Sequence, residues 1–153
     1  MNFLQYSLSA LISYLGLIIG IIVMYCAKEE QKAGKKYFQW TQTIIVLLIC
    51  VLSLYFKLQW IIALTVILII FILFMKNIKV KSYYLFPTFG ILFFLSSMNQ
   101  NLLLYQATLI FLYGMVTSSP AIDFKKKNYL QIFLGHISFL IISILLFSVS
   151  TMF

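Results

Sequence analysis

Long apolar stretches alternate with short hydrophilic gaps along the whole chain. The apolar segments are residues 8–27, 39–56, 60–75, 83–98, 102–118 and 130–151. A hydrocarbon core of about 30 Å needs roughly 20 helical residues, with about 17 as the lower limit. The first and last segments exceed that length, whereas the third and fourth are marginal. The pattern predicts an all-α polytopic transmembrane helix bundle, with residues 1–153 as a single integral membrane domain and six spans paired as three antiparallel hairpins.

The fourth and fifth segments allow a second arrangement. Pro87 and Gly90 weaken the fourth segment as a helix, and the gap that follows it, residues 99–101, is a polar Asn-Gln-Asn sequence. Non-helical backbone at membrane depth is tolerated where protein or water satisfies it. The two segments could therefore be full spans or a re-entrant pair, and the charge pattern is the same in both cases.

The lysines set the orientation of the predicted spans. Ten of the eleven lysines fall in the gaps 28–37, 76–82 and 120–128, which follow the first, third and fifth segments. Loops rich in Lys or Arg stay on the cytoplasmic side of a membrane. We therefore expect the odd-numbered spans to run inward and the even-numbered spans outward, with both termini outside the cell membrane.

Composition limits the kinds of partner. The chain is 63% hydrophobic and only 9% charged, whereas soluble domains are about 25% charged. Nearly all of its length is used in spans, so no separate extramembrane domain is expected. The net charge of +8 lies beside span ends, where each lysine attracts anionic lipid headgroups by about 1 kcal/mol. This placement favours membrane lipids rather than nucleic acid as the partner of the positive charge.

Small residues line one face of the first predicted span. They are Ser9, Ser13, Gly16 and Gly20, with steps of four, three and four residues. Such spacing places side chains on a single helical face. Small residues let two helices approach closely, and van der Waals contact then holds them together in lipid. The face is predicted to pack either against a second copy of the chain or against another helix of the same chain.

Two further segments carry polar residues at helical spacing. The second has Gln42, Cys50, Ser53 and Lys57, and the fifth has Gln106, Tyr113 and Thr117. Facing each other, these stripes would line a polar passage. The same residues could instead form interhelical hydrogen bonds, which contribute about 0.6 kcal/mol each on average. The sequence leaves both interpretations open.

His136 is the only histidine, and it lies in the sixth predicted span about 10 Å from its cytoplasmic end. A buried ionisable group in a membrane is a candidate for function, here as part of the polar passage. A neutral imidazole bonded to a neighbouring Ser or Tyr is the structural alternative. The only carboxylates, Glu29, Glu30 and Asp123, all lie in hydrophilic gaps. That placement excludes a paired-aspartate protease and leaves too few ligands for zinc, so no catalytic residue, metal or cofactor is predicted.

Two stretches carry a resemblance to other proteins. Lys28–Phe38 (KEEQKAGKKYF) and Phe111–Pro120 (FLYGMVTSSP) resemble segments of uncharacterised small multi-span membrane proteins from archaea. The resemblance covers about 20 residues and has no known chemistry attached to it. It implies a cell-membrane protein and gives no activity.

These observations favour a non-enzymatic integral membrane protein that acts as a subunit or packing partner of a membrane complex. A protein partner or a homo-oligomer is expected on that interpretation. The alternative is a small channel, transporter or lipid-handling protein with a polar passage between the second and fifth spans.

Overall fold

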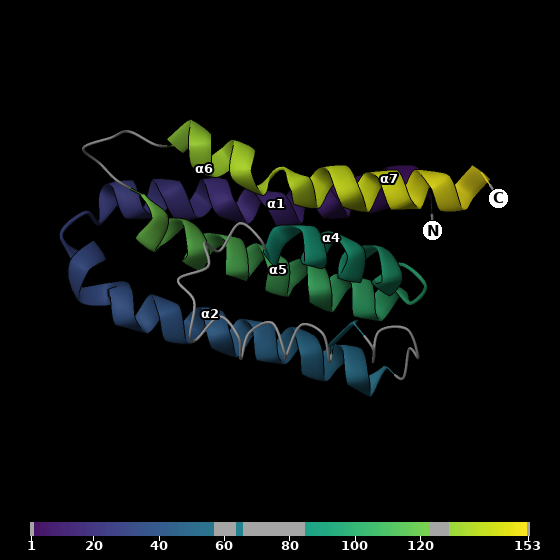
Figure 1. Ribbon diagram of the computed structural model, residues 1–153, viewed down its shortest axis with the longest axis horizontal. Coiled ribbons are helices and arrows are strands. Elements are labelled where there is room, and N and C mark those ends of the chain that lie inside the picture. Colours follow the sequence, from purple (N-terminus) through teal and green to yellow (C-terminus); the bar gives the residue numbers. More distant parts are fainter. Residues whose placement is uncertain (1, 57–63, 66–84, 123–128, 153) are drawn as a thin grey trace.

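The computed structural model describes residues 2–56, 64–65, 85–122 and 129–152, and every element within those residues is a helix (Figure 1). The helices are α1 (Phe3–Cys26), α2 (Glu30–Tyr55), α4 (Leu85–Ser96), α5 (Gln100–Ala121), α6 (Tyr129–His136) and α7 (Ser138–Met152). The all-α prediction is confirmed for this part of the chain.

Among the described residues, four stretches are long and apolar enough to cross a membrane. They are Phe3–Cys26, Lys36–Tyr55, Gln100–Ser118 and Ile132–Thr151, the last of which runs through α6 and α7. At 1.5 Å per residue, the 12 residues of α4 extend about 18 Å, which is shorter than a hydrocarbon core. The third predicted segment falls almost entirely outside the described residues. The described part of the chain is thus a membrane-like helical bundle with four candidate spans.

Two helix boundaries differ from the sequence-based expectation. Helix α2 begins at Glu30, nine residues before the apolar segment that predicted it. Its first turns are rich in Glu, Gln, Lys and Ala, which are strong helix formers, so the helix extends through the hydrophilic gap. The last predicted segment is interrupted at Ile137, where the backbone N–H bonds to the carbonyl of Leu134 at 3.4 Å.

The ends of the four candidate spans lie toward two opposite ends of the bundle (Figure 1). At one end, the Gln31 side chain donates a hydrogen bond to the carbonyl of Ile122 at 2.7 Å. That bond joins the start of α2 to the end of α5. At the other end, the rings of Phe3 and Phe147 lie 6.2 Å apart and bring the two terminal helices together.

The turn between α4 and α5 also lies at the end that holds both termini (Figure 1). Asn99 caps α5, because its side-chain oxygen accepts hydrogen bonds from the backbone N–H groups of Asn101 and Leu102 at 3.0 and 3.3 Å. These are donors that the first turn of a helix cannot satisfy internally. The ring of Phe56, just after α2, lies 6.4 Å from the ring of Tyr105 in α5 and places the end of α2 here as well.

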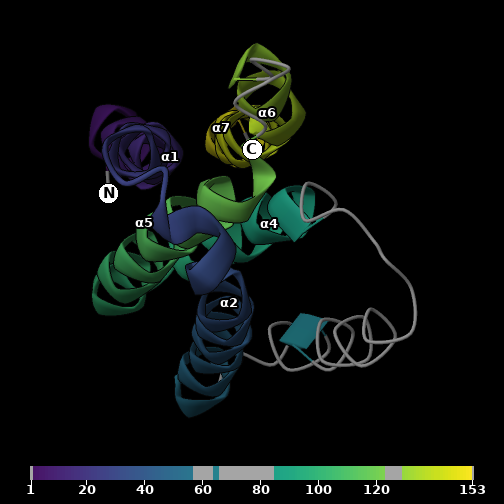
Figure 2. The same cartoon turned by 90° about the vertical axis from the view of Figure 1, so that its left-hand side faces the viewer.

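Helix α5 occupies the centre and contacts α1, α2 and α4 (Figure 2). Its contact with α1 is the most extensive in the bundle and depends on glycines in both helices. A Cβ atom at Gly16 would lie 2.7 Å from the carbonyl carbon of Phe111, and one at Gly20 would lie 2.7 Å from Cα of Met115. Both distances are shorter than real Cβ contacts. The small-residue face of α1 therefore packs against backbone of the same chain.

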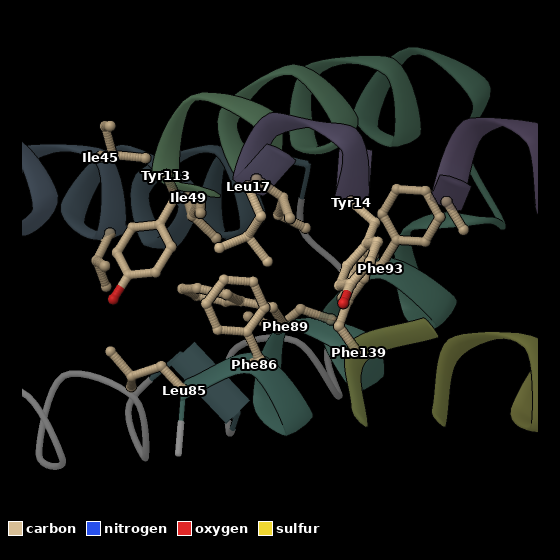
Figure 3. Close-up of a cluster of buried hydrophobic side chains, with 14 of the residues drawn as sticks. Tyr14, Leu17, Ile45, Ile49, Leu85, Phe86, Phe89, Phe93, Tyr113 and Phe139 are labelled. Atoms are coloured by element: carbon tan, nitrogen blue, oxygen red, sulfur yellow. The ribbon is translucent and has the colours of Figure 1, made fainter. Parts of the chain in front are cut away.

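The aromatic core lies mainly between α4 and its neighbours (Figure 3). Gly90 allows α4 to approach α7, since a Cβ there would lie 2.9 Å from the carbonyl oxygen of Phe139. Phe93 packs edge-on against Phe139, with ring centroids 5.6 Å apart. On another side of α4, the ring of Tyr6 in α1 lies 5.3 Å from the ring of Phe93 and also stacks on Phe147 at 4.1 Å. The short helix α4 is thus held on both sides by buried aromatic rings.

Replacement of Gly16 or Gly20 by Leu is expected to force α1 away from α5. Overpacking of a close contact typically costs about 1–3 kcal/mol, so thermal unfolding in detergent should occur at a lower temperature. Ile19→Phe is the matched control, because Ile19 is 37% exposed on another face of α1. Equal unfolding temperatures for the glycine variants and the control would contradict this packing.

Candidate functional site

The predicted polar stripes of α2 and α5 meet at a buried hydrogen bond. The Gln106 side-chain amide donates to the hydroxyl of Ser53 at 2.9 Å. That hydroxyl in turn donates to the backbone carbonyl of Ile49, one turn earlier in α2, at 2.8 Å. Gln106 and Ser53 are both fully buried. The bond therefore connects two candidate spans through polar groups that are shielded from lipid.

A second polar contact lies nearer the end of the bundle where Gln31 bonds to Ile122. The Gln42 side-chain amide donates to the backbone carbonyl of Val116 in α5 at 3.4 Å. Gln42 is half-buried. The side-chain oxygen of Gln106 is an unused acceptor: it is buried and has no hydrogen-bond partner among the described residues. The α2–α5 interface thus has polar contacts at two positions along the helices, one at Gln42 and one at Gln106. At the second position the side-chain oxygen of Gln106 can still accept a hydrogen bond.

The other residues of the predicted passage are placed as follows. Cys50 and Thr117 are buried, and Lys57 lies outside the described residues. Tyr113 is also buried, and its ring packs on α4, 4.8 Å from Phe89 and 5.8 Å from Phe86 (Figure 3). The structure therefore brings Ser53 and Gln106 together and directs the ring of Tyr113 toward the aromatic core.

His136 lies in a different part of the bundle from the α2–α5 contacts. It is the last residue of α6 and is 3% exposed. Its Nδ1 is hydrogen-bonded to the backbone carbonyl of Ile132, one turn earlier. Its ring meets the ring of Phe86 edge-on, with centroids 4.3 Å apart. The structural alternative anticipated a Ser or Tyr partner, whereas the observed partner is a carbonyl of the same helix.

Two tyrosines of α1 were not identified as functional residues from the sequence. The Tyr14 hydroxyl donates to the carbonyl of Phe133 at 2.7 Å, and the Tyr6 hydroxyl donates to the carbonyl of Ser143 at 3.2 Å. Each bond joins α1 to the last candidate span. A buried tyrosine hydroxyl usually finds a partner, so their depth in an apolar segment was a usable signal. The identity of the acceptors depends on the fold.

The Tyr14 bond supplies a partner for a backbone carbonyl that the interruption at Ile137 would otherwise leave unbonded. In an unbroken helix the carbonyl of Phe133 would accept a bond from the N–H of Ile137, four residues later. That N–H bonds instead to Leu134. The hydroxyl of Tyr14 occupies the carbonyl of Phe133 in its place. The break between α6 and α7 is therefore stabilised by a side chain from α1.

The counterpart of the α1 glycines on α5 was also missed. A Cβ atom at Gly114 would lie 2.9 Å from the backbone nitrogen of Leu17. Ser118 follows four residues later, is fully buried and lies against Gly20. Gly114 and Ser118 form a small-xxx-small pair, which is the signal that could have identified α5 as the partner of α1.

The site as a whole offers buried neutral polar groups: two amides, several hydroxyls and one imidazole. Within the described residues, no three His, Cys, Asp or Glu side chains lie close enough together to hold a metal ion. Such groups can form hydrogen bonds between helices or bind a polar molecule.

The chain matches no protein-family model, no curated protein and no solved structure.

Tyr14→Phe is expected to destabilise the fold, because it leaves the part-buried carbonyl of Phe133 without its partner. An unsatisfied buried polar group costs about 1–3 kcal/mol, which reversible unfolding in mixed detergent micelles can measure. Tyr105→Phe is the matched control, since Tyr105 is 53% exposed. An equal, negligible effect of both substitutions would show that the hydroxyl of Tyr14 does not support the break.

Proposed function

We propose that this chain is a non-enzymatic multi-pass protein of the cell membrane that serves as a subunit or packing partner of a membrane complex. The observation that carries the proposal is the use of polar side chains in the candidate spans. Gln106 bonds to Ser53, and Gln42 bonds to a backbone carbonyl of the facing helix. Polar groups that bond helix to helix stabilise a bundle. The two amide nitrogens used in these bonds are then not available to a passing solute.

The proposed topology has six spans, with both termini outside and the basic gaps in the cytoplasm. It is supported by the grouping of helix ends. The end of the bundle where Gln31 bonds to Ile122 also carries Lys28, which lies just after α1. The opposite end holds both termini and the Asn99 turn (Figure 1). Under the positive-inside rule the lysine-bearing end faces the cytoplasm, where anionic headgroups are the proposed lipid partners.

The proposed contact with a partner subunit or a second copy lies within the bilayer. Helix α2 packs chiefly on α5, and its other faces leave large apolar side chains exposed. These are Ile44, Leu47, Leu48, Val51 and Leu54. In a membrane this surface contacts lipid or a partner helix. Since the spans use nearly the whole chain, a partner that the protein recognises would contact it through such faces or through the short connections.

A small channel, transporter or lipid-handling protein is the second candidate, and one observation favours it. The side-chain oxygen of Gln106 is buried without a hydrogen-bond partner among the described residues. A water molecule or polar solute between the second and fifth spans would satisfy that oxygen.

The topology is tested by labelling single cysteines with an impermeant thiol reagent in intact cells. In a background without Cys26 and Cys50, Ala33→Cys and Ser82→Cys should be protected, because both positions lie in proposed cytoplasmic gaps. Asn2→Cys should react. The reverse pattern, with labelling at Ala33 and protection at Asn2, would invert the proposed orientation.

The two functions are separated by Gln106→Leu and Gln42→Leu. If these amides only bond helix to helix, each substitution should cost less than about 2 kcal/mol of stability, and the wild-type protein should show no flux in proteoliposomes. Thr108→Leu is a matched control on α5, because the hydroxyl of Thr108 is exposed and bonds within its own helix at 2.9 Å. A saturable wild-type flux that is lost in the two glutamine variants and retained in the control would favour the second candidate.

A further inference from the structure

The break between α6 and α7 is stabilised by specific side-chain hydrogen bonds. Helix α6 ends at His136 and α7 begins at Ser138. Two side chains form hydrogen bonds with backbone carbonyl groups of the last turn of α6. Tyr14 bonds to the carbonyl of Phe133, and His136 bonds to that of Ile132. The interruption is therefore fixed by contacts from two helices at a position well inside a candidate span.

The bond of His136 to its own helix fixes the tautomer of the ring. A backbone carbonyl only accepts hydrogen bonds, so Nδ1 must carry the proton that it donates to Ile132. In the neutral imidazole, Nε2 then has a free lone pair and acts as an acceptor. The imidazole is 3% exposed, and Nε2 is buried without a hydrogen-bond partner among the described residues. The ring thus presents one unused acceptor to the interior of the bundle.

A second unpartnered group lies on the other side of the break. The hydroxyl of Ser138 is also buried and has no hydrogen-bond partner among the described residues. The ring nearest to His136 belongs to Phe86, which has no polar atom. Buried polar atoms are nearly always hydrogen-bonded in native structures, to protein or to an ordered molecule. The unpartnered Nε2 of His136 indicates that something polar is held against its ring at this break.

We propose that the break between α6 and α7 holds a bound O–H donor, either a water molecule or the hydroxyl of a lipid or other alcohol, whose hydrogen is accepted by Nε2 of His136. The free lone pair of Nε2 selects a donor and would repel an anion. A bound oxygen can in turn accept a hydrogen bond from the hydroxyl of Ser138. A metal ion fits less well, because the described residues offer no group of three metal-ligating side chains. This inference goes beyond a packing function, because it assigns an internal binding position to the bundle.

The test uses the fact that the chain has a single histidine. The protein is labelled with 15N-histidine, placed in lipid bilayers at mildly alkaline pH and studied by solid-state NMR, so that only His136 contributes ring signals. We expect Nδ1 to carry the proton and Nε2 to show the chemical shift of a hydrogen-bonded acceptor. A proton on Nε2, or the shift of an unbonded Nε2, would overturn the proposal.

The source of the donor is identified by transfer of magnetisation from bulk water. Transfer to the ring indicates a bound water molecule. A hydrogen-bonded shift without transfer indicates an alcohol, which should be recovered by extraction and mass spectrometry of the purified protein. Both results support the proposed O–H chemistry.

Two variants test hydroxyl groups of the protein as the donor. Ser138→Ala removes an unpartnered hydroxyl two residues along the chain, and Tyr113→Phe removes the hydroxyl of a ring that also contacts Phe86. The hydrogen-bonded shift of Nε2 should persist in both variants. Its loss in either one would show that the hydroxyl of Ser138 or Tyr113 is the donor, and the proposed bound molecule would be wrong.

Discussion

The close approach of two backbones, α1 against α5, is the contact on which the rest of the bundle depends. Inside a bilayer, apolar side chains are already out of water, so packing them against another helix brings no hydrophobic gain. Helices associate there through van der Waals contact and hydrogen bonds. Gly16 and Gly20 on α1 and Gly114 on α5 remove the side chains that would hold the two helices apart. With α1 on one side of α5, the remaining faces of α5 are available to α2 and α4 (Figure 2).

Hydrogen bonds between helices then fix positions that packing alone leaves adjustable. Ser53 and Gln106 join α2 to α5, and Tyr14 joins α1 to the end of α6. The Tyr14 bond has a second consequence, because it satisfies a carbonyl that the break at Ile137 leaves without its helical partner. Ser53 and Gln106, which were candidates for a passage, thus bond two helices to each other. This use of polar residues is the physical basis for proposing a packing role.

The sequence predicts which residues share a face of a helix, because this depends only on their spacing. The period of Gly16 and Gly20 placed both on one face of α1, and the two glycines lie against α5. Spacing does not reveal the partner of that face. The acceptors of Tyr14 and His136 could not be predicted either, since one lies 119 residues away and the other depends on a side-chain rotamer. The extension of α2 back to Glu30 was missed because apolarity marks where a helix meets lipid, whereas helix propensity decides where it begins.

The central claim is that the glycine face of α1 is buried by α5 of the same chain. A cryo-electron microscopy map of the purified protein in a lipid nanodisc tests it most directly. The account predicts Gly16 and Gly20 against the backbone of Phe111 and Met115 within one copy of the chain. A map in which these glycines face the α1 helix of a second copy, with α5 displaced from them, would contradict it.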